Sequence, residues 1–315
     1  MGTHLLPRAL QGIVRSSPVN IIGGTSTHAI MHGVVVSARL LDGRSLARRM
    51  RAALRDDVAA YTETHGSPPC MVAIGSAADP AAETYFTLKL DAARNVGIRL
   101  ELLLLPVDAD TAAAMAAVRS AADDPRVHGI FVQYPLPRID ARACNAGIPV
   151  AKDIDCANPE TLARLRAGED VFPAASAVAI MALLEEGGIG VTGRGVFVGT
   201  GAPAIAEPLV VLLERAGADV ARASAAAGAD ALRDTLVGAD IVIFPAGVPH
   251  ALEADWLPDG AVVVDGGYFG RRRPDDILRA AAPRLSAWVA ARGGVGPVTV
   301  DVLLRHTYVA AIATH

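Results

Sequence analysis

The chain has 315 residues, 52% of them hydrophobic, so it is long enough for two domains with cores of ordinary size. Its formal net charge of −4 argues against a nucleic-acid partner held by a general basic field, and no apolar run reaches the roughly 20 residues of a membrane span. The cysteines Cys70, Cys144 and Cys156 have neither metal-ligand nor disulfide spacing, which predicts no metal site and a reducing, cytoplasmic location.

Residues 1–37 are expected to form a disordered extension, because they are rich in Gly, Ser, Thr and His and show no clear period. They also lack the basic start and apolar block of a secretion signal. A helix capped by Asp42 or Ser45 is expected to run to about His65. The next expected elements are strands at 70–75, 98–105 and 127–133 and helices at 79–97 and 108–124.

This alternation of strands and helices is interrupted at 150–173, where mixed polar residues and two prolines suit a crossing between domains. A helix at 174–187 then opens a second series. Its expected strands are short and apolar and lie at 195–199, 218–223, 239–245 and 260–267. The predicted fold class is therefore α/β, with parallel sheets in two domains.

The first candidate site is the segment Gly199-Thr-Gly-Ala-Pro-Ala204, which follows an expected strand and precedes a helix. This is the dinucleotide fingerprint G-x-G-x-x-G/A in its required context. Gly199 and Gly201 permit a tight turn at Thr200 and the close approach of a pyrophosphate, and the helix N-terminus offers free N–H groups. Cofactor binding is the prediction, and a plain strand-to-helix turn is the alternative.

The cofactor predicted for this site is NADP. The next strand ends in Ala221-Arg222-Ala223-Ser224, at the place where an acidic side chain usually meets the free ribose hydroxyl of NAD. Arg222 and Ser224 suit a 2′-phosphate instead, so NADP is favoured and NAD stays open. A solvated Arg222 is the alternative.

The second candidate site begins with ETYFTLKL, residues 83–90. Lys89 and Lys152 are the only lysines in a chain with 29 Lys plus Arg. Tyr85 and Lys89 share a helix face because they are four residues apart. Burial lowers the pKa of a lysine, whereas an arginine cannot become a neutral base, so Lys89 is a candidate base. A half-buried Tyr85 and a solvated Lys89 are the alternatives.

Two further residues are expected near Lys89. Gln133 ends the third strand, at the sheet edge where α/β proteins place ligands, unless it only satisfies backbone groups there. Asp155 lies close to Lys152 in the crossing segment. A phenol, an amine, an amide and a carboxylate therefore converge in the predicted site.

A third candidate is RGGVGPVTVDVLLRHT at 292–307. The glycine-rich backbone around Gly296 and Pro297 suits either close approach to a flat or anionic group or a structural loop. Thr299 is expected to cap the last helix.

Together, the motifs YFTLK, FVQYPLP, KDID and GGVGPVT resemble those of the bifunctional methylenetetrahydrofolate dehydrogenase/methenyltetrahydrofolate cyclohydrolase family, from about Ala38 to the C-terminus. The resemblance implies NADP-dependent oxidation of 5,10-methylenetetrahydrofolate to 5,10-methenyltetrahydrofolate and its hydrolysis to 10-formyltetrahydrofolate. These reactions interconvert tetrahydrofolates in one-carbon metabolism, which serves purine biosynthesis. The resemblance also implies a cytoplasmic homodimer.

In fold, the resemblance implies a three-layer α/β catalytic domain at 38–160 that is completed by a C-terminal helix at 298–315. It implies a Rossmann-type NAD(P)-binding domain at 161–297, with folate bound in the cleft between the two domains.

In site residues, the resemblance implies that Lys89 is the central catalytic group and that Gln133 holds and tunes it. Tyr85 stacks on the folate and Asp155 anchors the pterin. The GGVGPVT motif adds further substrate-binding residues, which are Gly296, Pro297 and Thr299.

The cofactor half departs from the family's pattern, Gly-x-Ser-x-x-Val-Gly-x-Pro. The loop is one residue longer, and Glu207 stands where the family has a basic residue. A carboxylate near a pyrophosphate is unfavourable by about 1 kcal/mol or more. Tyr268 is expected on the nicotinamide side of the cofactor.

Three alternatives to the bifunctional enzyme therefore stay open. They are a paralogue with one activity or a changed substrate, a non-catalytic folate-binding homologue, and an unrelated Rossmann dehydrogenase of the shikimate-dehydrogenase kind. The last would not require YFTLK and VQYPLP together.

Overall fold

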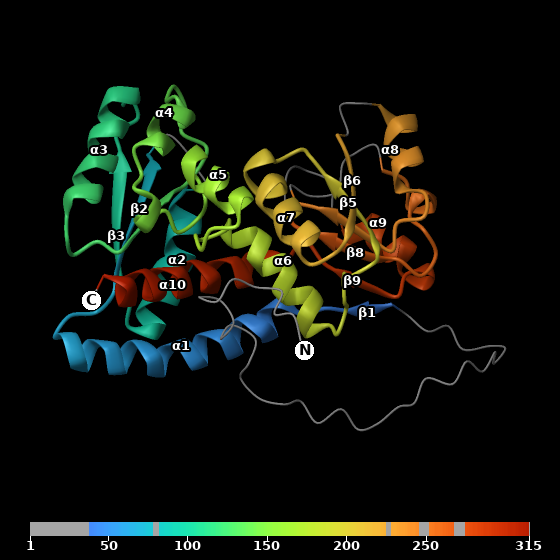
Figure 1. The fold of residues 1–315 in the computed structure, drawn as a ribbon, viewed down its shortest axis with the longest axis horizontal. Helices are drawn as coiled ribbons and strands as arrows, with labels where there is room; N and C mark the ends of the chain where they lie inside the picture. The colour runs from blue at the N-terminus through green and yellow to red at the C-terminus, as the bar shows by residue number, and fades with distance from the viewer. Residues whose placement is uncertain (1–37, 78–81, 225–227, 246–251, 268–274, 315) are drawn as a thin grey trace.

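The computed structural model describes residues 38–77, 82–224, 228–245, 252–267 and 275–314. The described chain forms two parallel sheets, each with its own helices (Figure 1). Three long helices connect them, namely α1 (Gly43–His65), α6 (Ala175–Glu186) and α10 (Val295–Ala313). The predicted two-domain α/β fold is thereby confirmed. The expected extension, 1–37, lies outside the described residues.

Within the described residues, the sheet of the first domain has the parallel order β3-β2-β4. Its strands are β2 (Cys70–Ser76), β3 (Arg99–Leu105) and β4 (Gly129–Val132), with helices α2 (Ala82–Val96), α3 (Thr111–Asp123) and α4 (Ala141–Ala146). The central strand β2 is buried along its whole length, as its continuous apolar sequence predicts. The side chain of Asp42 accepts a hydrogen bond from the backbone N–H of Arg44, so Asp42 is the cap of α1.

The sheet of the second domain has the parallel order β1-β9-β8-β7-β5-β6 in the part of the chain that is described. Its predicted strands are β5 (Gly195–Gly199), β6 (Asp219–Ala223), β7 (Ile241–Phe244) and β8 (Val262–Asp265), and its helices are α7 (Pro203–Arg215), α8 (Ala229–Leu236) and α9 (Asp275–Ala281). The order from β6 to β9 is the 2-1-3-4-5 form of the doubly wound sheet. Its topological switch point lies between β5 and β7, where such sheets bind ligands.

Two strands of this sheet are not predicted by the sequence pattern. β9 (Ala287–Val289) is three residues long, too short to show a period, and β1 (Arg39–Leu40) pairs with it in parallel. Residues 39–40, expected in the first domain, therefore extend the second sheet. The crossing segment is also more regular than expected, since it contains α5 (Pro159–Ala167). Short 3₁₀ turns lie at η2 (Val150–Lys152), η4 (Ala254–Trp256) and η5 (Ala282–Arg284).

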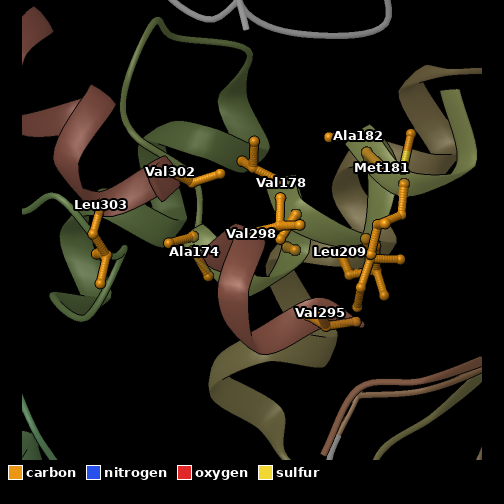
Figure 2. Packing of buried hydrophobic residues seen from close by; sticks show 14 of the residues in the cluster. Ala174, Val178, Met181, Ala182, Leu209, Val295, Val298, Val302 and Leu303 are labelled. Carbon is orange, nitrogen blue, oxygen red and sulfur yellow. The ribbon is translucent and has the colours of Figure 1, made fainter. Parts of the chain in front are cut away.

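The core between the two domains is built by α6 and α10. Nearly all of α6 is buried, and α10 packs against α6, α1 and α2. Figure 2 shows Val298 and Val302 of α10 beside Val178 of α6, with Leu209 of α7 close to Met181. Burying each of these side chains stabilises the fold by about 1.5–3 kcal/mol relative to exposure. The C-terminal helix therefore holds α6, which opens the second domain, against the first.

The start of α10 differs from the prediction. Gly294 is its N-cap, so Thr299 lies one turn inside the helix, 3.1 Å from the backbone oxygen of Val295 and 3.4 Å from Ser176 Oγ. A Cβ on Gly294 would lie 2.3 Å from the Ala290 oxygen, and Gly293 has a φ of 81°. The close backbone approach predicted for this glycine-rich segment is therefore, at Gly293 and Gly294, an approach to other residues of the same chain. No helix in the described segments is long and apolar enough to cross a membrane.

Candidate functional site

The site is organised around Lys89, which lies on α2 and is only 8% exposed. Its Nζ donates a hydrogen bond of 2.7 Å to Oε1 of Gln133. Gln133 directly follows β4, and its backbone N–H bonds to the Ile74 oxygen of the neighbouring strand at 2.8 Å. The other end of its amide, Nε2, donates to the Tyr134 oxygen at 2.9 Å. This second bond fixes which end of the amide faces the lysine, so Gln133 presents an acceptor.

The surroundings of Lys89 disfavour its charged form. Burial lowers its pKa from the ordinary value of 10.5 to about 8, although the carboxylate of Asp155 acts in the opposite direction. The ring centre of Phe131 lies 4.8 Å from the amine, a cation–π contact that, like Asp155, favours the charged form and so opposes the effect of burial. Lys89 is therefore an amine that can lose and regain a proton near neutral pH.

Asp155 lies in the crossing segment and faces the start of α6. Its Oδ1 accepts a hydrogen bond of 2.7 Å from the backbone N–H of Ala175. Burial raises its pKa to about 7, the bond from Ala175 lowers it, the neighbouring Asp153 raises it and Lys89 lowers it. The structure thus brings an amine and a carboxylic acid together, each shifted toward its neutral form.

Asp153 supports the turn that carries Asp155. It is fully buried and accepts backbone hydrogen bonds from Ala157 at 2.9 Å and from Asn158 at 2.8 Å. In the sequence, the resemblance to the family singles out Asp155 rather than Asp153. The structure also distinguishes them, because the fully buried carboxylate of Asp153 is used by its own segment, whereas Asp155 is partly exposed.

The second lysine has a different role from the first. Nζ of Lys152 donates to the backbone oxygens of Ala122 at 2.7 Å and of Asp124 at 2.8 Å, at the end of α3. These carbonyls end a helix and lack partners within it, so a cation there is favourable. Lys152 therefore joins the crossing segment to α3.

His306, a fully buried residue of α10, is not predicted as a site residue by the sequence pattern. Its Nδ1 lies 2.7 Å from the Ile154 oxygen, so this nitrogen carries the proton, and its ring packs on Phe172 at 4.9 Å between centroids. Burial lowers its pKa to about 4, which keeps the ring neutral. Ile154 directly precedes Asp155, and Phe172 lies shortly before Ala175. His306 therefore holds in place both segments that form the hydrogen bond between Asp155 and Ala175. The only sequence feature that could have identified His306 was a histidine within a largely apolar helical segment.

His306→Leu is expected to lower the free energy of unfolding by about 1–3 kcal/mol, because it leaves the buried Ile154 oxygen without a donor. The variant is also expected to hold Asp155 less firmly against the start of α6. Chemical denaturation and the hydrogen-exchange rate of the Ala175 N–H measure the two effects. His65→Leu is the matched control, since His65 also bonds a backbone oxygen but is exposed, and its loss is expected to change neither. Equal effects of His306→Leu and His65→Leu would contradict the role assigned to His306 in holding these two segments.

The fingerprint turn lies at the switch point of the second sheet. β5 ends at Gly199, and a Cβ there would lie 3.2 Å from the Phe244 ring of β7. The backbone N–H of Thr200 donates to the Ala223 oxygen at 3.0 Å, and Gly201 then leads into α7. No side chain of the described chain caps α7. Pro203 has no N–H and the N–H of Ile205 donates to the Ala202 oxygen at 3.0 Å, so the N–H of Ala204 is the first-turn donor that faces an anion at this helix start.

Glu207 and Arg222 are paired with other charges in this domain. Glu207, near the start of α7, contacts Arg166 at 2.7 Å and Arg222 at 3.8 Å. Arg222, near the end of β6, also bonds Glu214 at 2.9 Å. The carboxylate that seemed unfavourable beside a pyrophosphate is therefore compensated by two guanidinium groups.

The remaining predicted site residues are placed as follows. Gly296 and Pro297 form the first turn of α10, and Thr299 lies beside Ser176, next to the Ala175 N–H that Asp155 accepts. Ser224 follows β6 directly. Tyr268 and the side chain of Tyr85 lie outside the described residues.

Comparison with known proteins gives a family for both domains. The models of the tetrahydrofolate dehydrogenase/cyclohydrolase catalytic domain and NAD(P)-binding domain match residues 41–155 and 174–315. The bifunctional FolD protein of Teredinibacter turnerae is 34% identical over 270 residues, which cover 85% of this chain and 96% of the relative. That of Acidobacterium capsulatum is 33% identical, with 88% and 98% covered.

Solved structures agree with this result. The methylenetetrahydrofolate dehydrogenase-cyclohydrolase (FolD) of Trypanosoma brucei, complexed with NADP and an inhibitor, has a TM-score of 0.81 and 28% identity, covering 88% of this chain and 98% of its own. A 5,10-methylenetetrahydrofolate dehydrogenase of the silkworm Bombyx mori gives the same TM-score, identity and coverage. The chain therefore belongs to the tetrahydrofolate dehydrogenase/cyclohydrolase family.

Proposed function

We propose that this protein oxidises 5,10-methylenetetrahydrofolate to 5,10-methenyltetrahydrofolate with NADP and hydrolyses the product to 10-formyltetrahydrofolate. The observation that carries the proposal is the buried amine of Lys89, bonded to Gln133 and electrostatically coupled to Asp155. Family membership supplies the substrate class. We assign Lys89, Gln133, Tyr85 and Asp155 as the catalytic residues.

The hydrolytic step follows from the state of Lys89. With a pKa of about 8, roughly a tenth of the molecules hold the amine neutral at pH 7, far more than for a solvated lysine. A neutral amine can take a proton from the water that attacks the methenyl carbon, while Gln133 keeps Nζ in place. A protonated Lys89 would be repelled by the cationic substrate, by about 4 kcal/mol at 4 Å with an effective dielectric of 20.

Substrate binding is assigned to the surroundings of Asp155. Its carboxylate is the proposed anchor of the pterin, and Tyr85 is the proposed stacking partner. Gly296, Pro297 and Thr299 complete the proposed folate site, because the start of α10 meets the start of α6 beside Asp155.

The dinucleotide is assigned to the fingerprint turn, where Gly199, Thr200 and Gly201 lead into an uncapped helix. When bound, it supplies the acceptor for the hydride of the methylene group. The N–H of Ala204, at the start of α7, would face its pyrophosphate, and Arg222 and Ser224 lie where doubly wound domains read the ribose 2′ position. Tyr268 is the proposed residue on the nicotinamide side.

A second candidate function is hydrolysis alone. The longer cofactor loop, with Ala206 and Glu207 in place of a glycine and a basic residue, favours it. The assay that separates the two uses 5,10-methylenetetrahydrofolate with NADP or NAD and follows both nicotinamide reduction and methenyl decay. We expect both signals. Methenyl decay without reduction would establish the single activity, and the absence of both would leave a folate-binding homologue.

We also propose that the protein is a cytoplasmic homodimer. β3 is an edge strand of its sheet in the described chain, and Leu104 at its end is 46% exposed. Exposed strand edges readily pair with another chain. The buried cysteines Cys70, Cys144 and Cys156 are all unlinked, which suits a reducing compartment. The mass in solution, measured by light scattering, tests the dimer, and a monomer mass would refute it.

A further inference from the structure

Four charged side chains form an ion network around Glu207, which stands where the family's loop pattern has a basic residue. We call it the Glu207 network, and its members are Arg166, Glu207, Glu214 and Arg222. Glu207 contacts both guanidinium groups, through Oε2, at 2.7 Å to Arg166 and 3.8 Å to Arg222. Arg222 completes the network with its bond of 2.9 Å to Glu214.

The position of the network relates it to the fingerprint turn. Arg222 pairs in register with Val198 of β5, and the next residue, Ala223, accepts the hydrogen bond from the N–H of Thr200. Arg222 is therefore beside the turn and about 20 residues after it, which is where doubly wound domains read the ribose 2′ position. Glu207 lies on the second turn of α7, between Arg222 and Arg166.

The charges of the network cancel, because two guanidinium groups face two carboxylates. A 2′-phosphate that binds Arg222 must compete with Glu207 and Glu214 for the same donors, and it is repelled by both. A free 2′-hydroxyl carries no charge and meets neither cost. NADP and NAD share the pyrophosphate and differ at the ribose 2′ position. A change that acts through Arg222 should therefore alter the affinity for NADP and leave the affinity for NAD unchanged.

We propose that Glu207 is a specificity-determining residue that, together with the closer Glu214, competes for Arg222 and so weakens the preference of this protein for NADP over NAD. This inference rests on the proposed function, since it requires a dinucleotide at the fingerprint turn. It deepens that proposal by assigning cofactor choice to the carboxylates that compete for Arg222.

The test measures dissociation constants of NADP⁺ and NAD⁺ by calorimetry, without folate, for the full chain and for Glu207→Gln. We expect the variant to bind NADP⁺ about 3- to 5-fold more tightly, as the removal of one partly exposed charge predicts, and NAD⁺ within about 1.5-fold of the parent chain. Adding Arg222→Gln to Glu207→Gln should abolish the gain, because the donor for the 2′-phosphate is then missing.

Glu160→Gln is the matched control. Glu160 forms an exposed ion pair with Arg164 on α5, so its loss should change neither constant. Unchanged binding of NADP⁺ by Glu207→Gln would overturn the inference, as would equal tightening of both cofactors, which would place Glu207 at the pyrophosphate. If NADP⁺ and NAD⁺ bind as expected but the protein does not turn over 5,10-methylenetetrahydrofolate, the inference about Glu207 holds and the proposed function is refuted. No binding to any variant would refute both.

Discussion

Replacing Lys89 with methionine is expected to slow hydrolysis of 5,10-methenyltetrahydrofolate by about 10²- to 10⁴-fold, the usual contribution of a positioned acid–base group. Methionine fills the same buried space on α2 but has no group that can bond Gln133 or take a proton. Lys89→Arg should fail as well, because a guanidinium cannot become neutral. Folate affinity should change only a few-fold. Decay of the methenyl absorbance, corrected for the uncatalysed rate, and a folate titration measure these outcomes.

The matched control is Lys152→Met, which removes the only other lysine of the chain. Lys152 bonds backbone oxygens at the end of α3, so its loss should lower the free energy of unfolding by about 1–3 kcal/mol and leave hydrolysis unchanged. A Lys89→Met protein that hydrolyses the substrate within tenfold of the parent rate would show that the amine is not the base.

Asp155→Asn is expected to raise the KM for folate by about 10- to 100-fold, the value of one hydrogen bond to a charged group. The asparagine oxygen can still accept from the N–H of Ala175, so the local fold should be kept. Asp155→Asn also removes the charge that favours protonated Lys89, so the pKa of Lys89 should fall below its present value of about 8. Since the neutral amine is the base, hydrolysis should reach its half-maximal rate at a lower pH than in the parent.

Steady-state kinetics across a pH series test both parts of this prediction. Asp170→Asn is the control, because this carboxylate is exposed in the same crossing segment. A midpoint that stays near pH 8 would mean that Asp155 does not act on Lys89, and an unchanged KM would mean that it does not hold the substrate.

Local sequence determined most of the secondary structure and selected Lys89 and Gln133, which the structure brings together in the candidate site. The predicted strands β2, β5 and β7 were found because buried parallel strands are continuous apolar runs bounded by turn residues. Lys89 was identified from its motif and from the near-absence of other lysines. Gln133 followed from its place at the end of a strand, which decides on which sheet edge its side chain lies.

Only the tertiary structure decided which of these groups act on one another. The contacts of Asp155 with Ala175, of His306 with Ile154 and of Glu207 with Arg166 join segments between 20 and 152 residues apart. Sequence periodicity reports which face of an element is buried, and it carries no information on what packs against that face. The difference between the two lysines, one tuned by burial and one bound to a helix end, therefore appears only in the folded chain.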